Sequence, residues 1–170
     1  FSLILDAARR SNDIQLYSRA VDIALQSRSG DGALAAARAW SQAAPQDRRA
    51  NNHLFQILVA LNQVKESLEP LKKEIALAPE SERNIVISLI PRHYSNVSDK
   101  KLAATVVQEA LEPHTKKSNT AAAAWTSIGR MQLANDNIHS ALEAAQKGLA
   151  ADNKAIAPAL LALELMGRNV

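Results

Sequence analysis

The stretch from Ala123 to Asn153 constrains the fold of this chain more than any other. Trp125, Ile128 and Gly129 are three and four positions apart, so they share one face of a helix. Asn135-Asp136-Asn137 then brings residues that are typical of turns and helix caps. After it, small and aliphatic residues return at helical spacing: Ile138, Ala141, Leu142, Ala145, Gly148 and Leu149. The pattern predicts two amphipathic helices joined by a tight turn.

Gly129 and Gly148 lie inside the two helices that this pattern predicts. A glycine in a helix costs about 1 kcal/mol relative to alanine, so both positions indicate that another backbone approaches closely. Each helix buries one stripe, and the pair still leaves an apolar outer face. A unit of this kind is expected to stack on similar neighbours.

These residues resemble the tetratricopeptide repeat, a helix-turn-helix unit of about 34 residues. Trp125 falls on the first aromatic position of the motif, Ile128 on its large aliphatic position and Gly129 on its small crossing position. Asp136 falls on the turn, and Ala141 and Gly148 fall on the two small positions of the second helix. Two positions depart from the motif: Gln132 replaces a large aromatic residue, and Asn153 replaces a proline.

The rest of the chain reads as more degenerate units of the same kind. Pro45 and Pro79, which end two of them, lie 34 positions apart. The predicted helices are Phe1–Arg10, Ile14–Ser27, Leu34–Ala44, Gln46–Leu61, Val64–Leu77, Glu80–Asn96, a helix from Ser98-Asp99 to Pro113, the two helices of the organising stretch, and Lys154–Met166. They form one domain over 1–170, with a partial unit at 1–12, full units at 13–45, 46–79, 80–115 and 119–153, and a terminal helix in 154–170.

Several local predictions can be checked against a structure. Pro70 is expected to kink its helix or delay its start, and Pro91 is expected to bend the next one. The β-branched run 85–90 could form a strand, but its register favours a helix with Ile87, Ile90 and Tyr94 buried. The segment Ser29-Gly30-Asp31-Gly32 is expected to be a turn.

The sequence thus predicts an all-α fold, and the resemblance implies a right-handed superhelix of antiparallel helix pairs. The chain opens within what reads as a second helix and without an initiator methionine. We therefore expect a segment of a longer, bacterial-type multi-repeat protein, with any targeting segment upstream. The compartment is left open, because the absence of cysteine excludes disulfides and thiolate metal sites but decides nothing else.

Composition and motifs argue against catalysis. The four histidines do not share an i, i+4 face and have no carboxylate at ligand spacing, so no metal or cofactor is predicted. Phosphate-binding glycine motifs and the nucleophile-elbow motif are missing, and Ser98…Lys101 reads as a helix cap followed by solvated lysines.

Trp40 and Trp125 could stack on a ligand, but their place on apolar stripes favours core packing. A run long enough to span a membrane is also missing.

A net charge of +3 and a pI near 9.3 leave nucleic-acid binding as a weaker alternative, because the lysines and arginines are not densely clustered. The non-catalytic lobe of a larger enzyme is a third reading. The resemblance favours a scaffold or adaptor that binds a protein or peptide; oligomeric state is left open.

In the tetratricopeptide family, the first helices of successive units line a concave groove. The resemblance places in that groove the residue after each small crossing residue, together with those four and seven positions earlier. The candidate partner-binding residues are Arg49, Asn52, Gln56, Ser88, Arg92, Thr126 and Arg130, with Ile85 and Ala123 in the same rows. Arginine forks bind carboxylates in a bidentate way, so the expected ligand is an acidic or C-terminal peptide segment. Arginines that only keep this face hydrated are the alternative.

Overall fold

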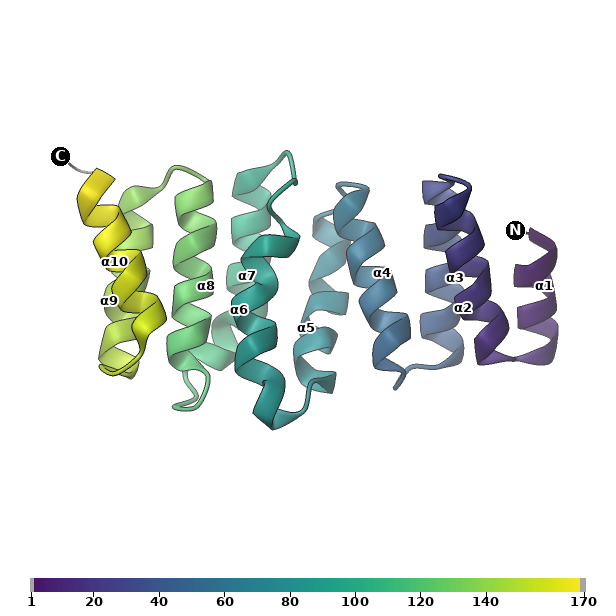
Figure 1. Cartoon of the computed structure of the whole chain (residues 1–170), viewed down its shortest axis with the longest axis horizontal. Helices are drawn as coiled ribbons and strands as arrows, with labels where there is room; N and C mark the ends of the chain where they lie inside the picture. Colours follow the sequence, from purple (N-terminus) through teal and green to yellow (C-terminus); the bar gives the residue numbers. More distant parts are fainter. Residues whose placement is uncertain (1, 169–170) are drawn as a thin grey trace. The chain divides into compact units, whose positions relative to one another are not determined.

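The computed structural model describes residues 2–168, and within them every regular element is a helix, which confirms the all-α prediction. The chain divides into two compact units, Phe1–Leu77 and Ala78–Val170, each of which is described by itself. Figure 1 shows the order of the helices along the chain. The first unit contains α1 (Ser2–Ser11), α2 (Ile14–Gln26), α3 (Gly30–Ala43), α4 (Arg48–Ala60), the 3-10 turn η1 (Lys65–Ser67) and α5 (Leu68–Leu77).

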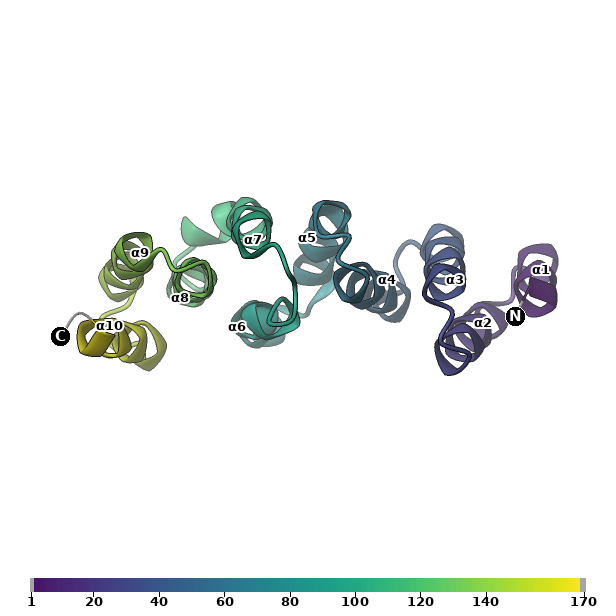
Figure 2. The same ribbon diagram turned by 90° about the horizontal axis from the view of Figure 1, so that it is seen from above.

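The second unit begins with the 3-10 turn η2 (Glu80–Glu82) and continues with α6 (Arg83–His93), α7 (Lys100–Thr115), α8 (Ala121–Ala134), α9 (Ile138–Ala151) and α10 (Ile156–Arg168). Seen from above, α7 and α9 lie on one side of this unit, and α6 and α10 lie on the other with α8 between them (Figure 2). The helix α8 contacts all four of these neighbours. It is therefore the central element of the unit.

The turns inside three of the helix pairs share one geometry. Arg28, Asn62 and Asp136 each adopt a left-handed conformation, with φ between 55° and 57°. In each turn the next backbone N–H donates to a carbonyl five residues earlier, at 2.8 to 2.9 Å. This is the Schellman termination of a helix, which satisfies the last carbonyl groups and reverses the chain. The recurrence of the turn shows that the pairs are structural repeats.

The beginnings of the helices are also built alike. Asp13 and Asp47, which are 34 positions apart, each accept a hydrogen bond from the backbone N–H two residues later, at 2.8 and 2.9 Å. Asp99 and Asn137 cap α7 and α9 by accepting from the N–H three residues later. A side-chain cap satisfies a helix donor that would otherwise have no partner, and typically contributes about 1 kcal/mol.

Small residues form much of the core. In the first unit Trp40 is fully buried among alanines of α2, α3 and α4. In the second unit the side chains of Ile87, Ile90 and Tyr94 are buried, which confirms the helical reading of the run 85–90. At Gly129, an added Cβ would lie 2.6 Å from Leu161 Cδ2 and 3.2 Å from the backbone oxygen of Ala141. The close approach expected at this glycine is therefore confirmed.

Several boundary predictions were wrong. The glycines of 29–32 lie in the first turn of α3, because Ser29 caps that helix and Arg28 makes the turn. The helix α7 passes through Pro113 to Thr115, whose hydroxyl donates to the Glu112 carbonyl and holds the last turn. The terminal helix starts at Ile156 rather than Lys154, and it passes through Gly167 to Arg168 rather than ending at Met166.

The proline predictions had different outcomes. Pro70 is the third residue of α5, which follows a 3-10 turn, so the delayed start is confirmed. The helix α6 begins at Arg83 rather than Glu80 and ends at His93, two residues after Pro91. The expected bend at Pro91 stays a prediction. Pro91 occupies the small crossing position, and the Cα atoms of α6 approach those of α8 more closely than those of α7.

Candidate interaction surface

Two of the candidate residues on the helix α4, Asn52 and Gln56, form hydrogen bonds with other residues of this chain. Asn52 donates from Nδ2 to Glu74 Oε1 of α5 at 3.2 Å, and its Oδ1 accepts from Gln56 Nε2 at 2.8 Å. Glu74 is 6% exposed and also receives Arg48 Nε at 3.4 Å and Asn51 Nδ2 at 3.1 Å. Asn52 is thus part of the network that holds α4 against α5, while Gln56 remains exposed.

Arg49 belongs to a different part of α4. Its guanidinium lies 5.4 Å from the ring centroid of the buried Trp40, and its Nη2 donates to Ser18 Oγ of α2 at 3.5 Å. It borders a hollow of about 600 Å³ between α2 and α4, whose lining also includes Arg19 and Asp22. The guanidinium makes no ion pair in the described part of the chain. This arginine is held in place while its charge stays uncompensated.

The helix α6 carries Ser88 and Arg92, and both are exposed. Arg92 has no side-chain hydrogen bond or ion pair with any residue between 2 and 168. Ile85, one turn before Ser88, is 61% exposed, and Leu89 is 44% exposed. A positive charge therefore stands beside exposed apolar surface on this helix.

The helix α8 carries the remaining two candidates, which differ in accessibility. Thr126 is 6% exposed, and its hydroxyl donates to the Ala122 carbonyl at 2.7 Å. Arg130 is exposed and lies 3.7 Å from Glu164 of α10, measured from Nη1 to Oε2. Glu164 also pairs with Arg168 at 3.2 Å. The hydroxyl of Thr126 is thus occupied by its own helix, whereas Arg130 shares a carboxylate with a second arginine.

The structure brings together the candidates of α6 and α8, because these helices are in contact. Ser127 of α8 is buried and donates to the Ile87 carbonyl of α6 at 2.8 Å. Ser88, Arg92, Thr126 and Arg130 therefore belong to one unit, and Arg49, Asn52 and Gln56 belong to the other. Whether either group binds a partner stays a prediction.

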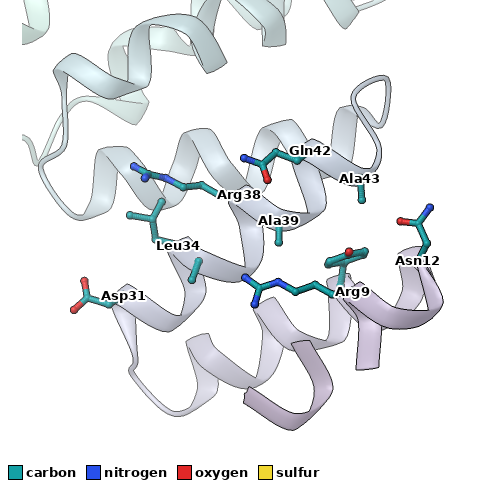
Figure 3. A pocket seen from close by; sticks show the side chains of 10 residues that line it. Arg9, Asn12, Asp31, Leu34, Arg38, Ala39, Gln42 and Ala43 are labelled. Carbon is teal, nitrogen blue, oxygen red and sulfur yellow. The ribbon is translucent and has the colours of Figure 1, made fainter. Parts of the chain in front are cut away.

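Sequence reasoning missed a hollow between two successive second helices. This hollow, shown in Figure 3, has a volume of about 680 Å³ and lies between α1 and α3, and Arg9 reaches into it. The residues of α3 that line this hollow recur at helical spacing, and that spacing is the sequence signal that could have revealed the hollow. They are Asp31, Leu34, Arg38 and Gln42. Arg38 forms an ion pair with Glu66, and Arg9 lies 3.7 Å from Asp6. Both arginines at this hollow are therefore already paired, whereas Asp31 has no ion pair within residues 2–168.

Another hollow that the sequence did not reveal, of about 410 Å³, lies between the second helix α7 and the first helix α8 of the next pair. Its lining includes Trp125, which is half-buried, so this tryptophan is less enclosed than the core position predicted for it. Lys147 of α9 lies 4.8 Å from the ring centroid and pairs with Glu143 at 2.7 Å. The hydrogen bond and charge of Lys147 lower the pKa of Glu143 below its ordinary value.

The described residues contain no group of three or more acidic or histidine side chains that could hold a metal ion. Between residues 2 and 168, no helix is both long and apolar enough to cross a bilayer.

Comparisons with known proteins give only distant likenesses to solved structures. No protein-family model matches the sequence, and no curated protein matches it. Among solved structures, the chain is similar to MamA 41-end from Desulfovibrio magneticus RS-1, with 17% identity and a TM-score of 0.44, over 92% of this chain and 85% of that one. A MamA RS-1 ArsTM double mutant gives the same identity and TM-score, over 92% and 84%. The repeated turns and crossings of the chain itself make it a tetratricopeptide-like helical repeat.

Proposed function

We propose that this chain is a non-catalytic protein-interaction module, and that it binds an acidic or C-terminal segment of a partner on its first helices. The observation that carries the proposal is the state of the arginines on α6 and α8. Arg92 has no partner in the described chain, and Arg130 is 3.7 Å from a carboxylate that a second arginine shares. The charge of Arg92 is therefore not used to hold the helices together, and the contact of Arg130 with α10 is long and shared.

The chemistry of the two side chains supports an anionic ligand. A guanidinium presents paired N–H donors that match a carboxylate in geometry and charge. Because both arginines are exposed, each ion pair contributes only about 0.2–1 kcal/mol. Affinity would then come from several such contacts together with burial of neighbouring apolar surface. Arg49 would act in the same way on the first unit, where the Trp40 ring and Ser18 hold it.

A charge-reversal experiment tests the proposal. The protein would be used to recover its partner from an extract, and the recovery compared with that by a double variant, Arg92→Glu with Arg130→Glu. We expect the double variant to lose most of the partner. The matched control is Lys65→Glu with Lys101→Glu, which changes the net charge equally at exposed positions away from the candidate residues.

Equal recovery by the wild type and the arginine variant would contradict the proposal. Recovery that depends on RNA and falls steeply with salt would instead support the nucleic-acid alternative, because phosphate binding releases counterions.

A further inference from the structure

The hollow between α7 and α8 offers a surface that the proposed function does not use. Five residues of α7 line it, together with Trp125 and Ile128 of α8, and none of these described residues is a candidate for binding the acidic partner. Its volume of about 410 Å³ lies in the lower part of the range of sites for small ligands, which begins at about 300 Å³. The hollow therefore has room for one side chain of a partner.

The charge of this hollow is negative. The described residues that line it include two carboxylates, Glu109 and Glu112, and no basic side chain. Glu112 pairs with Lys116 one turn later at 3.2 Å, but these two side chains are 67% and 74% exposed. Because so exposed a pair is weak, the carboxylate can exchange Lys116 for another cation. The hollow is therefore complementary to a positive charge.

The hydroxyl groups of the hollow are used by α7 itself. The hydroxyl of Thr105 donates to the Lys101 carbonyl at 3.0 Å, and that of Thr115 donates to the Glu112 carbonyl at 2.7 Å. The carboxylates remain as hydrogen-bond acceptors. A guanidinium has five N–H donors and no acceptor, so it matches these groups better than a neutral or an anionic group does.

Trp125 brings an aromatic ring to the hollow, and a cation already lies beside this ring. The Lys147 ammonium is 4.8 Å from the ring centroid and pairs with Glu143 at 2.7 Å. The negative face of an aromatic ring attracts cations, and arginine makes this contact more often than lysine because its planar group can also stack. Ile128, which is buried, adds apolar surface for a methylene stem.

The register of the two helices brings the ring and the carboxylates together. The helices α7 and α8 are consecutive, in contact and joined by a short connection, so they run antiparallel. Gln132 Nε2 of α8 donates to Gln108 Oε1 of α7 at 3.2 Å. One turn further along α7 and one turn back along α8, Glu112 is at about the level of Ile128, and Trp125 is the next turn. One ligand group can therefore reach both the carboxylate and the ring.

We propose that this hollow binds an arginine side chain of a partner segment. The methylene stem lies on Ile128, and the guanidinium stacks on Trp125. Its N–H groups donate to Glu109 and Glu112. Both carboxylates are exposed, so the hollow is open to a side chain that belongs to a longer chain. The inference is independent of the proposed function, because it concerns other residues and a ligand of opposite charge.

Nuclear magnetic resonance of the ¹⁵N-labelled protein tests the inference. The two tryptophans give one indole N–H signal each, and Trp40, which is fully buried in the first unit, is an internal control. Trp125→Phe assigns the two signals. The probes are four end-blocked tripeptides, glycine–X–glycine with arginine, lysine, citrulline or glutamate as X, and methylguanidine as a guanidinium without a chain.

We expect the arginine peptide to shift the Trp125 signal and to leave the Trp40 signal in place. It should bind about tenfold more tightly than the citrulline and glutamate peptides, which cannot satisfy the carboxylates with a charge. It should bind about threefold more tightly than the lysine peptide, which cannot stack, and than methylguanidine, which has no stem.

A pair of charge-matched variants tests the carboxylates. Glu109→Gln with Glu112→Gln should weaken binding of the arginine peptide about tenfold. The control is Glu66→Gln with Glu69→Gln, which changes the net charge equally and also removes exposed carboxylates that pair with basic side chains. It should leave binding unchanged. Because all four positions are exposed, the folds of both variants should be retained, and an unshifted Trp40 signal and unchanged circular dichroism would verify this.

Lys147→Gln tests the ring. It removes the cation that lies beside Trp125 and leaves the Glu143 carboxylate nearby, so it should tighten binding of the arginine peptide. Weaker binding by this variant would overturn the contact with the ring.

Other results would overturn the inference at different points. Equal binding of the citrulline peptide, or equal losses in the two glutamine double variants, would show that the hollow does not recognise a positive charge. Equal binding of the lysine peptide would overturn the assignment to a guanidinium. Equal binding of methylguanidine would overturn the assignment to a side chain of a partner segment.

Discussion

The carboxylate of Glu74 sets the orientation of the polar side chains along α4. It collects donors from Arg48, Asn51 and Asn52, and so links that helix to α5. A buried carboxylate is stable only when its hydrogen bonds are satisfied. The donors from Arg48, Asn51 and Asn52 are therefore needed to stabilise the packing of α4 against α5. Asn52 therefore has few hydrogen-bonding groups left for a ligand. Arg49, one turn earlier on α4, has no ion pair in the described chain and can still bind an anion.

His114 gives the structure a dependence on pH. Burial lowers its pKa below the ordinary value of 6.5, and the charges of Lys117 and Arg83 lower it further. The unfolded chain therefore binds a proton more readily than the folded one between the folded pKa and 6.5. Stability from the neutral imidazole is complete above pH 6.5 and is lost as the pH falls through that window.

We expect His114→Gln to reduce the loss of stability on acidification, since it removes this proton-binding difference. Urea unfolding at pH 5 and pH 7.5 would measure the change for the wild type and the variant. The other three histidines remain in both proteins, so they cancel in the comparison. An equal loss in the two proteins would show that His114 is not the group responsible.

At the scale of elements, helical periodicity predicted which segments are helices, because each one buries a single stripe. It failed where a boundary depends on one backbone conformation. Arg28 occupies a left-handed position that glycine or asparagine usually fills, so the turn was assigned to the glycines that follow it. Asn62, 34 residues later, has the same conformation and shows the position that the repeat requires.

The candidate surface was predictable only in part, for a related reason. The repeat register located Arg92 and Arg130 on exposed helix faces, because it follows from sequence spacing alone. The register could not show that the Thr126 hydroxyl donates to a carbonyl of its own helix, or that Asn52 donates to Glu74. Those outcomes depend on contacts between particular side chains, which a periodic pattern does not contain.

The crossing of α8, α9 and α10 leads to a prediction about Gly129. An alanine there would meet Leu161 Cδ2 at 2.6 Å, the Ala141 backbone oxygen at 3.2 Å and Ala144 Cβ at 3.3 Å. Overpacking costs about 1–3 kcal/mol, and about 1 kcal/mol is regained from helix propensity. With the middle of that range, about 2 kcal/mol, the difference is about 1 kcal/mol, so we expect Gly129→Ala to lower the free energy of unfolding by about 1 kcal/mol, measured by urea denaturation.

Two further variants separate the clash from other effects. Gly167→Ala is the matched control, because an added Cβ there meets nothing within 4 Å, and it should be neutral or stabilising. Leu161→Ala removes the closest contact, so the double variant should lose less than the sum of the two single losses. Additive losses would mean that the leucine is not what makes Gly129 necessary.

At the scale of the whole molecule, the division of the chain into two units has a measurable consequence. Trp40 is buried in the first unit, and Trp125 is half-buried in the second, so each can report on its own unit. In repeat proteins stability is approximately a sum of local terms between neighbours, and long arrays need not unfold in one step. A substitution should therefore lower the stability of the unit that contains it more than the stability of the other unit.

Gly129→Ala, introduced into the two single-tryptophan proteins, tests this expectation. With Trp40→Phe, fluorescence follows Trp125, and the urea midpoint should fall by about 0.3–1 M, given a loss of about 1 kcal/mol and an m value of about 1–3 kcal/mol/M. With Trp125→Phe, fluorescence follows Trp40, and the midpoint should fall by less. Equal shifts would instead mean that the chain unfolds as one cooperative body. Unequal shifts would mean that α4, which bears Arg49, and the helices α6 and α8, which bear Arg92 and Arg130, belong to segments of separate stability. The candidate residues of one unit could then be altered without unfolding the other unit.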